Sequence, residues 1–270
     1  MKAKPQSFTV ERPGVGRIGA AVSGSGPPLL LVAGLGSTMR IWGDLPRVLA
    51  PRFTVLTVDH RGVGGSRDVT PFSLEAAADD LAAVLDERGI GRCVAVGASM
   101  GGLVVAQLLA TRPERLSAAV LASTAARLTS HGRRIMALMR DLFQSLPPGR
   151  VGAALMSLAF APRFQERFPA LVDTAARQYG LDPEDVPGAL AQAECLLEGW
   201  DLREALSAVS VPSLVLAGGL DPIVSRHDTE ELARALRTEL VVVPDAAHSV
   251  LAEGGRELLE RVIRFAEEHA

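Results

Sequence analysis

The sequence has 270 residues, of which 48% are hydrophobic and 22% charged, and its formal net charge is −3. This composition is ordinary for a globular protein, and a chain of this length buries roughly three quarters of the surface that its unfolded form exposes. The slightly acidic balance argues against a nucleic-acid-binding protein, which usually carries a basic patch. The longest apolar run, Leu29 to Ala33, is far too short to span a bilayer. We therefore expect neither nucleic acid nor a membrane as a partner.

The N-terminal residues and the cysteines bear on the cellular compartment. Met1 to Gln6 are not followed by a long apolar stretch, so the sequence predicts no signal peptide and a cytoplasmic protein. Cys93 and Cys195 lie far apart and form no CxxC motif, and we expect two free, buried thiols. Because no cysteine and histidine cluster is present, we expect neither a metal nor a cofactor.

Short apolar runs along the chain predict a sheet. The segments Ser7–Arg12 and Gly14–Ser23 form a pair that is typical of a hairpin. The later runs are continuously apolar, as are strands of a mostly parallel sheet that is covered on both faces. We predict these buried strands at Leu29–Ala33, Phe53–Val58, Cys93–Val96, Leu116–Leu121, Ser213–Ala217 and Leu240–Val243.

Amphipathic helical patterns lie between these strands. The first pattern opens with Ser73, a residue type that favours the N-cap position of a helix. The predicted helices are Ser73–Arg88, Leu103–Ala110, Glu230–Arg237 and Glu257–Glu268. Strands that alternate with helices predict an α/β fold with a doubly wound, mostly parallel sheet and right-handed crossovers.

The alternation breaks between residues 125 and 206. This stretch contains only helical patterns, at Arg133–Phe143, Val151–Phe160, Leu171–Tyr179 and Glu184–Leu197, separated by turns that contain proline. We interpret it as a helical cap over the carboxyl edge of the sheet, inserted into a core formed by residues 1–124 and 207–270. The alternative is that these helices simply pack on the flank of the sheet.

A candidate nucleophile lies between a predicted strand and a predicted helix. Residues Gly97 to Gly101 have the form G-x-S-x-G, with Ser99 at the centre. In this context the pattern indicates a nucleophile elbow, a strained turn that exposes the serine hydroxyl at the top of the sheet. Residues without a Cβ are needed on both sides of the serine, so that the strand and the helix can pass closely.

A serine at its ordinary pKa needs a general base, which a third group must orient. Of the five histidines, His248 follows the last predicted strand and is the candidate base, while His60 follows the Phe53–Val58 strand and is its rival. The acid is expected between serine and histidine in the chain. Asp221 directly follows the strand Ser213–Ala217 and fits this order, whereas Asp245 is too close to His248 to reach around it easily.

Two backbone N–H groups are expected to form an oxyanion hole. One belongs to Met100, the residue after the nucleophile, and the other to the loop after the strand Leu29–Ala33. Leu35 is our choice within that loop, because the glycines on both sides let the backbone turn an amide toward the site. A second glycine pattern, Gly14 to Gly19, fits G-x-G-x-x-G but opens no helix, so we reject it as a dinucleotide-binding motif.

Four segments resemble motifs of the α/β-hydrolase family, and they occur in the order of that family. They are Gly97–Gly102 (G-x-S-M-G-G), Asp59–Ser66 (D-x-R-G-x-G-x-S), Val211–Asp221 (similar to V-P-T-L-V-x-x-G-x-x-D) and His248–Glu253 (H-x-x-x-x-E). The resemblance covers the chain from about residue 24 to its end, apart from the cap. It implies the α/β-hydrolase fold, makes His248 the base and makes His60 a structural loop residue.

The chain departs from this family at one position. Most members have His-Gly where this sequence has Ala33-Gly34. The run from Ala33 to Thr38, with Trp42 beyond it, looks more like the branch that holds 3-oxoadipate enol-lactonases, esterases and meta-cleavage C–C hydrolases. The missing histidine leaves open how the oxyanion loop is supported.

The sequence therefore predicts a serine hydrolase with Ser99, Asp221 and His248 as its catalytic triad. We expect it to cleave an ester or lactone of a small to medium apolar molecule, as a monomer or homodimer. The alternatives on the same fold are C–C bond hydrolysis, thioester hydrolysis or cyclisation of a biosynthetic intermediate, and a non-catalytic ligand-binding protein. The side chains expected to bind substrate are Trp42, Met136, Met139, Phe143, Phe160 and Trp200.

Overall fold

The computed structural model describes residues 5–179 and 181–270. At its centre is an eight-stranded sheet with the strand order β1-β2-β4-β3-β5-β6-β7-β8. β1 (Gln6–Arg12) and β2 (Gly16–Ser23) form the predicted antiparallel hairpin, and β2 also pairs antiparallel with β4 (Thr54–Val58). All further pairs are parallel, and the remaining strands are β3 (Pro28–Val32), β5 (Cys93–Ala98), β6 (Leu116–Ala122), β7 (Ser213–Gly218) and β8 (Leu240–Val243). The predicted mostly parallel α/β sheet is thus confirmed.

Helices cover both faces of this sheet, which explains why its strands are continuously apolar. In β3, Leu30 and Val32 pack into a core with α2 (Leu74–Glu87), α3 (Met100–Thr111) and α10 (Arg226–Ala235). The alternate residues Leu29 and Leu31 pack into a second core with α1 (Leu45–Leu49) and α12 (Gly255–Glu268). Successive side chains of a strand point to opposite faces, so both sets are buried.

The helix ends follow from local chemistry. The Ser73 hydroxyl accepts a hydrogen bond of 3.0 Å from the Ala76 N–H, so the predicted N-cap of α2 is confirmed. α3 begins at Met100, three residues before the predicted start at Leu103, because the turn at Ser99 leads directly into the helix. The G-x-G-x-x-G pattern lies in the β1–β2 hairpin and opens no helix, as expected.

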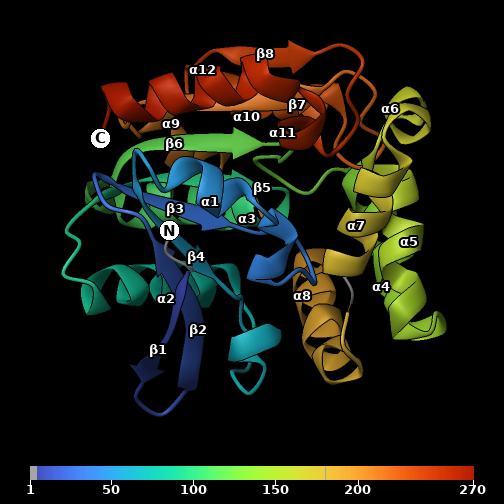
Figure 1. Cartoon of the computed structure of the whole chain (residues 1–270), viewed down its shortest axis with the longest axis horizontal. Coiled ribbons are helices and arrows are strands. Elements are labelled where there is room, and N and C mark those ends of the chain that lie inside the picture. The colour runs from blue at the N-terminus through green and yellow to red at the C-terminus, as the bar shows by residue number, and fades with distance from the viewer. Residues whose placement is uncertain (1–4, 180) are drawn as a thin grey trace.

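Among the described residues, six α-helices connect β6 to β7. They are α4 (Ser130–Ser145), α5 (Pro148–Ala159), α6 (Pro162–Arg167), α7 (Pro169–Tyr179), α8 (Val186–Glu198) and α9 (Arg203–Ser207). α4 to α8 gather beyond the carboxyl ends of the parallel strands (Figure 1). The division of the chain into a core and a cap at residues 125 and 206 stays a prediction.

Two smaller expectations can be compared with the fold. Both cysteines are free, but only Cys93 is buried, whereas Cys195 is half-exposed on α8. Burial raises the pKa of the Cys93 thiol to about 12, which keeps it protonated and unreactive. Within residues 5–179 and 181–270, no helix has the length and apolar character needed to cross a lipid bilayer. The cytoplasmic location stays a prediction.

Candidate active site

Ser99 occupies a sharp turn between β5 and α3, in the predicted strand–turn–helix context. Its φ of 56° lies in the left-handed region, which is uncommon for a residue other than glycine. A Cβ on Gly97 would come within 2.5 Å of the Gly101 carbonyl oxygen, and a Cβ on Gly101 within 2.1 Å of the Val32 carbonyl oxygen. The two glycines of the motif are therefore required by close backbone contacts, and the strain of the turn is concentrated on the serine.

Asp221 and His248, 27 residues apart in the chain, are in direct contact. Nδ1 of His248 lies 2.8 Å from Oδ2 of Asp221. The other carboxylate oxygen, Oδ1, accepts the backbone N–H groups of Ile223 at 2.8 Å and Val224 at 3.0 Å. The Asp221 side chain is only 2% exposed. Because a carboxylate accepts, Nδ1 carries the imidazole proton, and Nε2 is left free to act as a base.

A cavity of about 940 Å³ brings the histidine and the serine together. Ser99 and His248 both line it, as do Ala33 and Gly34 at the end of β3. The wall opposite the sheet comes from α4, α5 and α7, through residues such as Met139 and Leu155. The three residues predicted to work together thus lie at the carboxyl edge of the sheet, beneath the helices that connect β6 to β7.

The rival base and the rival acid lie elsewhere. His60 is fully buried, and its Nε2 is 2.9 Å from the Ala33 carbonyl oxygen. Burial lowers the pKa of His60 to about 4, so its imidazole is neutral near pH 7 and donates to this carbonyl. Asp245 is exposed in the loop that precedes His248. His60 therefore holds the loop that follows β3.

The two N–H groups expected to form the oxyanion hole are close to the serine. Leu35 and Met100 line a small cavity of about 50 Å³ that also reaches Ser99. Met100 is the first residue of α3, where a helix leaves its N–H without an intrahelical partner. In the part of the chain that the structure describes, the Leu35 N–H has no hydrogen-bond acceptor. Both donors are thus available next to the nucleophile.

The predicted substrate-binding side chains divide between these two cavities. Trp42, Met139 and Phe160 line the large cavity, whereas Met136 and Trp200 line the small one. Phe143 lines neither of the two cavities, so its role in substrate binding stays a prediction. Its side chain is 2% exposed and packs against the loop after β3, where its Cζ would lie 3.2 Å from a Cβ on Gly36. The helical pattern of α4 predicts that Phe143 is buried, but it does not predict which neighbour Phe143 contacts.

Several lining residues were not predicted. Among the described residues of the large cavity, the apolar ones that the sequence did not lead us to expect there include Leu35, Ile41, Leu45, Leu155, Leu171, Tyr179, Ile223, Val250 and Leu251, together with Ala33, Ala98, Ala122, Ala159, Ala175 and Ala252. Leu155 lies on the apolar face of the predicted helix Val151–Phe160, a signal that could have identified it. In the ranges 5–179 and 181–270, no three His, Cys, Asp or Glu side chains are grouped as metal ligands would be.

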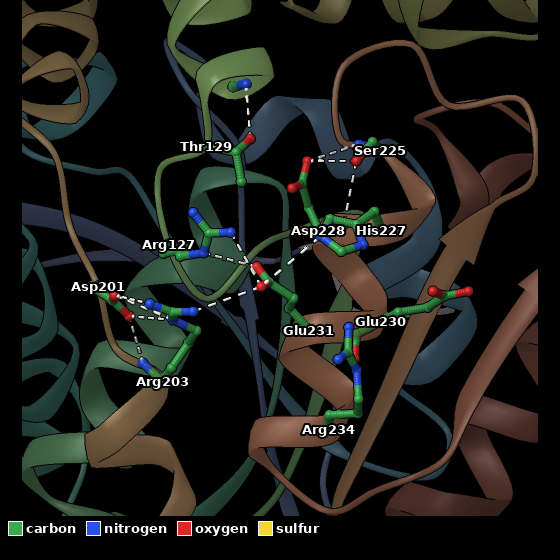
Figure 2. A network of polar contacts seen from close by, with 11 residues as sticks. Arg127, Thr129, Asp201, Arg203, Ser225, His227, Asp228, Glu230, Glu231 and Arg234 are labelled. Carbon is green, nitrogen blue, oxygen red and sulfur yellow. Dashed lines mark hydrogen bonds and ion pairs between the residues drawn. The ribbon is translucent and has the colours of Figure 1, made fainter.

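A network of polar and charged side chains holds α10, the helix that follows the segment of Asp221. Ser225 and Asp228 form a capping box at the start of α10, four residues after Asp221. One helical turn further on, Glu231 accepts two hydrogen bonds from Arg127, at 2.9 and 3.2 Å (Figure 2). These hydrogen bonds are the main reason why the pKa of Glu231 is lowered from its ordinary value. The helix behind the acid is thereby tied to the loop that follows β6.

Arg203 joins the same network from α9. Its Nη1 lies 3.7 Å from Oε1 of Glu231, while its Nε and Nη2 bind the carboxylate of Asp201 (Figure 2). α9 is the last of the helices between β6 and β7. Sequence reasoning missed this network, because its members come from three separate segments.

Comparison with known proteins agrees with the observed fold. A family model described as the alpha/beta hydrolase fold matches residues 27–255. The chain is 32% identical over 232 residues to a protein of Pseudomonas syringae named "Putative carbamate hydrolase RutD", covering 85% of this chain and 86% of the relative. It is 28% identical over 225 residues to 3-oxoadipate enol-lactonase 2 of Acinetobacter baylyi, covering 82% of each chain.

Solved structures give the same result. A thermophilic esterase from Thermogutta terrifontis superposes with a TM-score of 0.83 at 27% sequence identity, over 99% of this chain and 100% of the esterase. The family match spans most of the sheet and the site, and the relatives are named as hydrolases. The chain therefore belongs to the alpha/beta hydrolase fold family and is an enzyme of the hydrolase class.

Proposed function

We propose that the protein is a serine hydrolase that cleaves an ester or lactone of an apolar substrate through an acyl-serine intermediate. The observation that carries the proposal is that His248 is paired with Asp221 and lines the same cavity as Ser99. A histidine oriented by a buried carboxylate beside a serine in a strained elbow is the arrangement that activates a serine hydroxyl.

In the first half of the reaction, Nε2 of His248 takes the proton of Ser99 Oγ while Oγ bonds to the substrate carbonyl carbon. The carbonyl oxygen becomes an oxyanion that the N–H groups of Leu35 and Met100 bind. As the intermediate collapses, the bond to the leaving oxygen breaks, and that oxygen takes the proton from His248. One oxyanion-hole donor typically contributes about 3 kcal/mol to the stabilisation of the transition state.

In the second half, water replaces the alcohol. His248 removes a proton from the water, whose oxygen attacks the acyl carbon, and a second tetrahedral intermediate forms in the same hole. Its collapse releases the carboxylic acid and returns the proton to Ser99 Oγ. Asp221 keeps its charge throughout, holds the imidazole in one tautomer and stabilises the imidazolium that forms twice per cycle.

The cavities support an apolar substrate with one bulky part. The large cavity, about 940 Å³, is at the upper end of ordinary ligand pockets, which span roughly 300–1,000 Å³. Its wall includes Trp42, Leu155 and Phe160. The small cavity on the side of Leu35 and Met100 has room for only a few water molecules or a small group. The relatives are named for an ester, a lactone or a carbamate, and all three groups contain a carbonyl carbon that a serine could attack, which also favours this reaction class.

The test is the intact mass of the protein after treatment with a fluorophosphonate. We expect a single adduct on the wild type and on Ser249→Ala, a serine that lines the same cavity, and none on Ser99→Ala. Turnover of a panel of esters, lactones, thioesters and carbamates then identifies the substrate class, and Ser99→Ala should be inactive on all of them. A folded wild-type protein without an adduct and without turnover would refute the proposal.

A further inference from the structure

The loop that follows β3 contains a tight turn at Gly34–Ser37. The Ser37 N–H donates to the Gly34 carbonyl oxygen at 3.2 Å, and Gly36 has a φ of 66°. Leu35 is not among the described residues with positive φ. A positive φ at the third residue only is the signature of a type II turn, in which the central peptide, here Leu35–Gly36, has one definite orientation.

Two side chains from the helices above the cavity hold the two ends of this central peptide. The phenol Oη of Tyr179, at the end of α7, donates to the Leu35 carbonyl oxygen at 2.8 Å. The amide Oε1 of Gln192, in α8, accepts the Gly36 N–H at 2.8 Å. Since the carbonyl and the N–H belong to one peptide group, the two bonds together fix its rotation.

Both side chains are buried. Gln192 is 0% exposed, and its Nε2 donates to the Arg61 carbonyl oxygen at 2.8 Å, so the buried amide is hydrogen-bonded at both ends. Burial raises the pKa of Tyr179, which keeps the phenol protonated as a donor. A Cβ on Gly36 would come within 2.7 Å of the Tyr179 Oη and 3.3 Å of the Ala189 Cβ. At Gly36 the turn therefore packs closely against the two helices.

The sheet side supplies the third contact. His60 donates to the Ala33 carbonyl oxygen at 2.9 Å, two residues before Leu35. The Leu35 N–H lies in the chain between this contact and the central peptide that Tyr179 and Gln192 hold. Its direction depends on the backbone angles of Gly34 and Leu35, and these contacts limit both.

We propose that Tyr179 and Gln192 are positioning residues that aim the Leu35 N–H into the oxyanion hole. The inference rests on the proposed function, because an oxyanion hole has meaning only for acyl transfer. It also explains how the loop is supported where this chain has Ala33-Gly34 in place of His-Gly. The support comes from Tyr179 on α7 and Gln192 on α8, in addition to the contact that His60 makes from the side of the sheet.

The physical reason lies in how such donors act. A donor stabilises the transition state only when it already points at the developing charge. A type II turn that loses its side-chain partners at the central peptide can flip toward type I, which glycine at the third position readily accepts. The flip itself changes ψ of Leu35 and φ of Gly36. Once Tyr179 and Gln192 no longer hold the central peptide, the loop can also rotate about ψ of Gly34 and φ of Leu35, the two angles that set the direction of the Leu35 N–H, so a smaller fraction of molecules would hold the donor in place.

The experiment compares Tyr179→Phe and Gln192→Met with the wild type. Tyr179→Phe removes only the oxygen that binds Leu35, and Gln192→Met keeps the side-chain length but removes both amide bonds. Gln165→Met is the matched control, because the Gln165 amide binds the Ser157 and Phe160 carbonyls and does not contact the turn. The measurements are kcat and KM on p-nitrophenyl acetate, the inhibition constant of phenylboronic acid, which forms a tetrahedral adduct on the serine, and the melting temperature.

We expect kcat to fall by about tenfold in Tyr179→Phe and by about tenfold to a hundredfold in Gln192→Met, since complete loss of one oxyanion donor costs about 10²–10³. KM should change by less than about twofold, and the boronate should weaken by the same factor as kcat falls. Gln165→Met should match the wild type. Rates and boronate affinity within twofold of the control, with only the melting temperature lowered, would show a purely structural role and overturn the inference.

The behaviour of the wild type distinguishes a failure of this inference from a failure of the proposed function. If it turns over no ester and takes no fluorophosphonate, the proposed function fails and the inference fails with it. If the wild type is active and labelled at Ser99, but neither variant loses kcat, only the inference fails.

Discussion

The carboxylate of Asp221 is held on both sides, with Oδ2 lying 2.8 Å from Nδ1 of His248 and Oδ1 accepting the N–H groups of Ile223 and Val224. The backbone turn thus sets the direction of the carboxylate, and the carboxylate sets the direction of the imidazole. Such an arrangement selects the tautomer with the proton on Nδ1, which leaves Nε2 free toward the cavity.

Asp221→Asn tests this relationship. The amide has nearly the shape of the carboxylate but loses its charge and can impose the wrong tautomer on His248, so we expect kcat to fall by about 10⁴-fold. Asp245→Asn is the control, because Asp245 is exposed in the loop that precedes His248. Ester turnover and circular dichroism should be measured on both. A folded Asp221→Asn with more than a tenth of the wild-type kcat would exclude Asp221 as the acid.

Glu253 ties the histidine loop to the helices above the cavity. Its Oε1 accepts the Ala247 N–H, directly before His248, and its Oε2 accepts the Ala161 N–H between α5 and α6, both at 2.9 Å. Glu253→Gln retains only one acceptor oxygen, so one of the two N–H groups loses its partner. We expect kcat to fall by about tenfold, because small displacements of a catalytic group are costly. Glu257→Gln, exposed at the start of α12, should have no effect; equal kcat values in the two variants would contradict the assignment.

The sheet and the site residues at its edge were predictable because their signals are local. Strands that are covered on both faces are continuously apolar, and the carboxyl ends of parallel strands meet at one edge. Ser99, Asp221 and His248 each follow such a strand or its loop, so that the chain order and the topology alone place them on one side of the sheet. The short helices α1, α6 and α9, of five or six residues, were missed because they are too short to show a helical period.

The contacts of the helices between β6 and β7 were not predictable in the same way. Phe143 and Met139 share one amphipathic pattern, yet only Met139 lines the large cavity. Which neighbour a buried side chain meets depends on how the helices cross, and periodicity does not encode this. For the same reason, no local signal indicated that Tyr179 and Gln192 contact a loop more than 140 residues earlier in the chain.

His60 predicts a dependence of stability on pH. Its pKa is lowered to about 4 in the folded protein, against about 6.5 for an unfolded chain. Between these values the unfolded state binds a proton that the folded state does not, so the free energy of unfolding falls as the pH drops from about 6.5 to 4. The loss amounts to about 3 kcal/mol from this group alone.

The variant His60→Gln isolates this effect, since glutamine can still donate to the Ala33 carbonyl and does not titrate. Urea unfolding at pH 7 and pH 4 should show a smaller acid-induced loss of stability in the variant than in the wild type. His269→Gln is the control, because His269 is the C-cap of α12, where it contacts the ring and the carbonyl of Phe265 and lies far in the chain from the loop after β3. An equal loss in all three proteins would show that His60 is not the group responsible.

The large cavity predicts a preference for long acyl chains that one substitution should remove. Each methylene buried in an apolar pocket contributes about 0.8 kcal/mol, or roughly fourfold in kcat/KM, so the wild type should prefer p-nitrophenyl octanoate to the acetate. Ala175 lines the cavity from α7, and Ala175→Phe would place a ring in that space. We expect kcat/KM on the octanoate to fall by about tenfold or more while the acetate is unaffected. Ala170→Phe, on the same helix but exposed and outside the cavity, should leave both rates unchanged. If Ala175→Phe slows both esters equally, the acyl chain does not occupy this cavity, and the apolar part of the substrate must be sought on the leaving-group side.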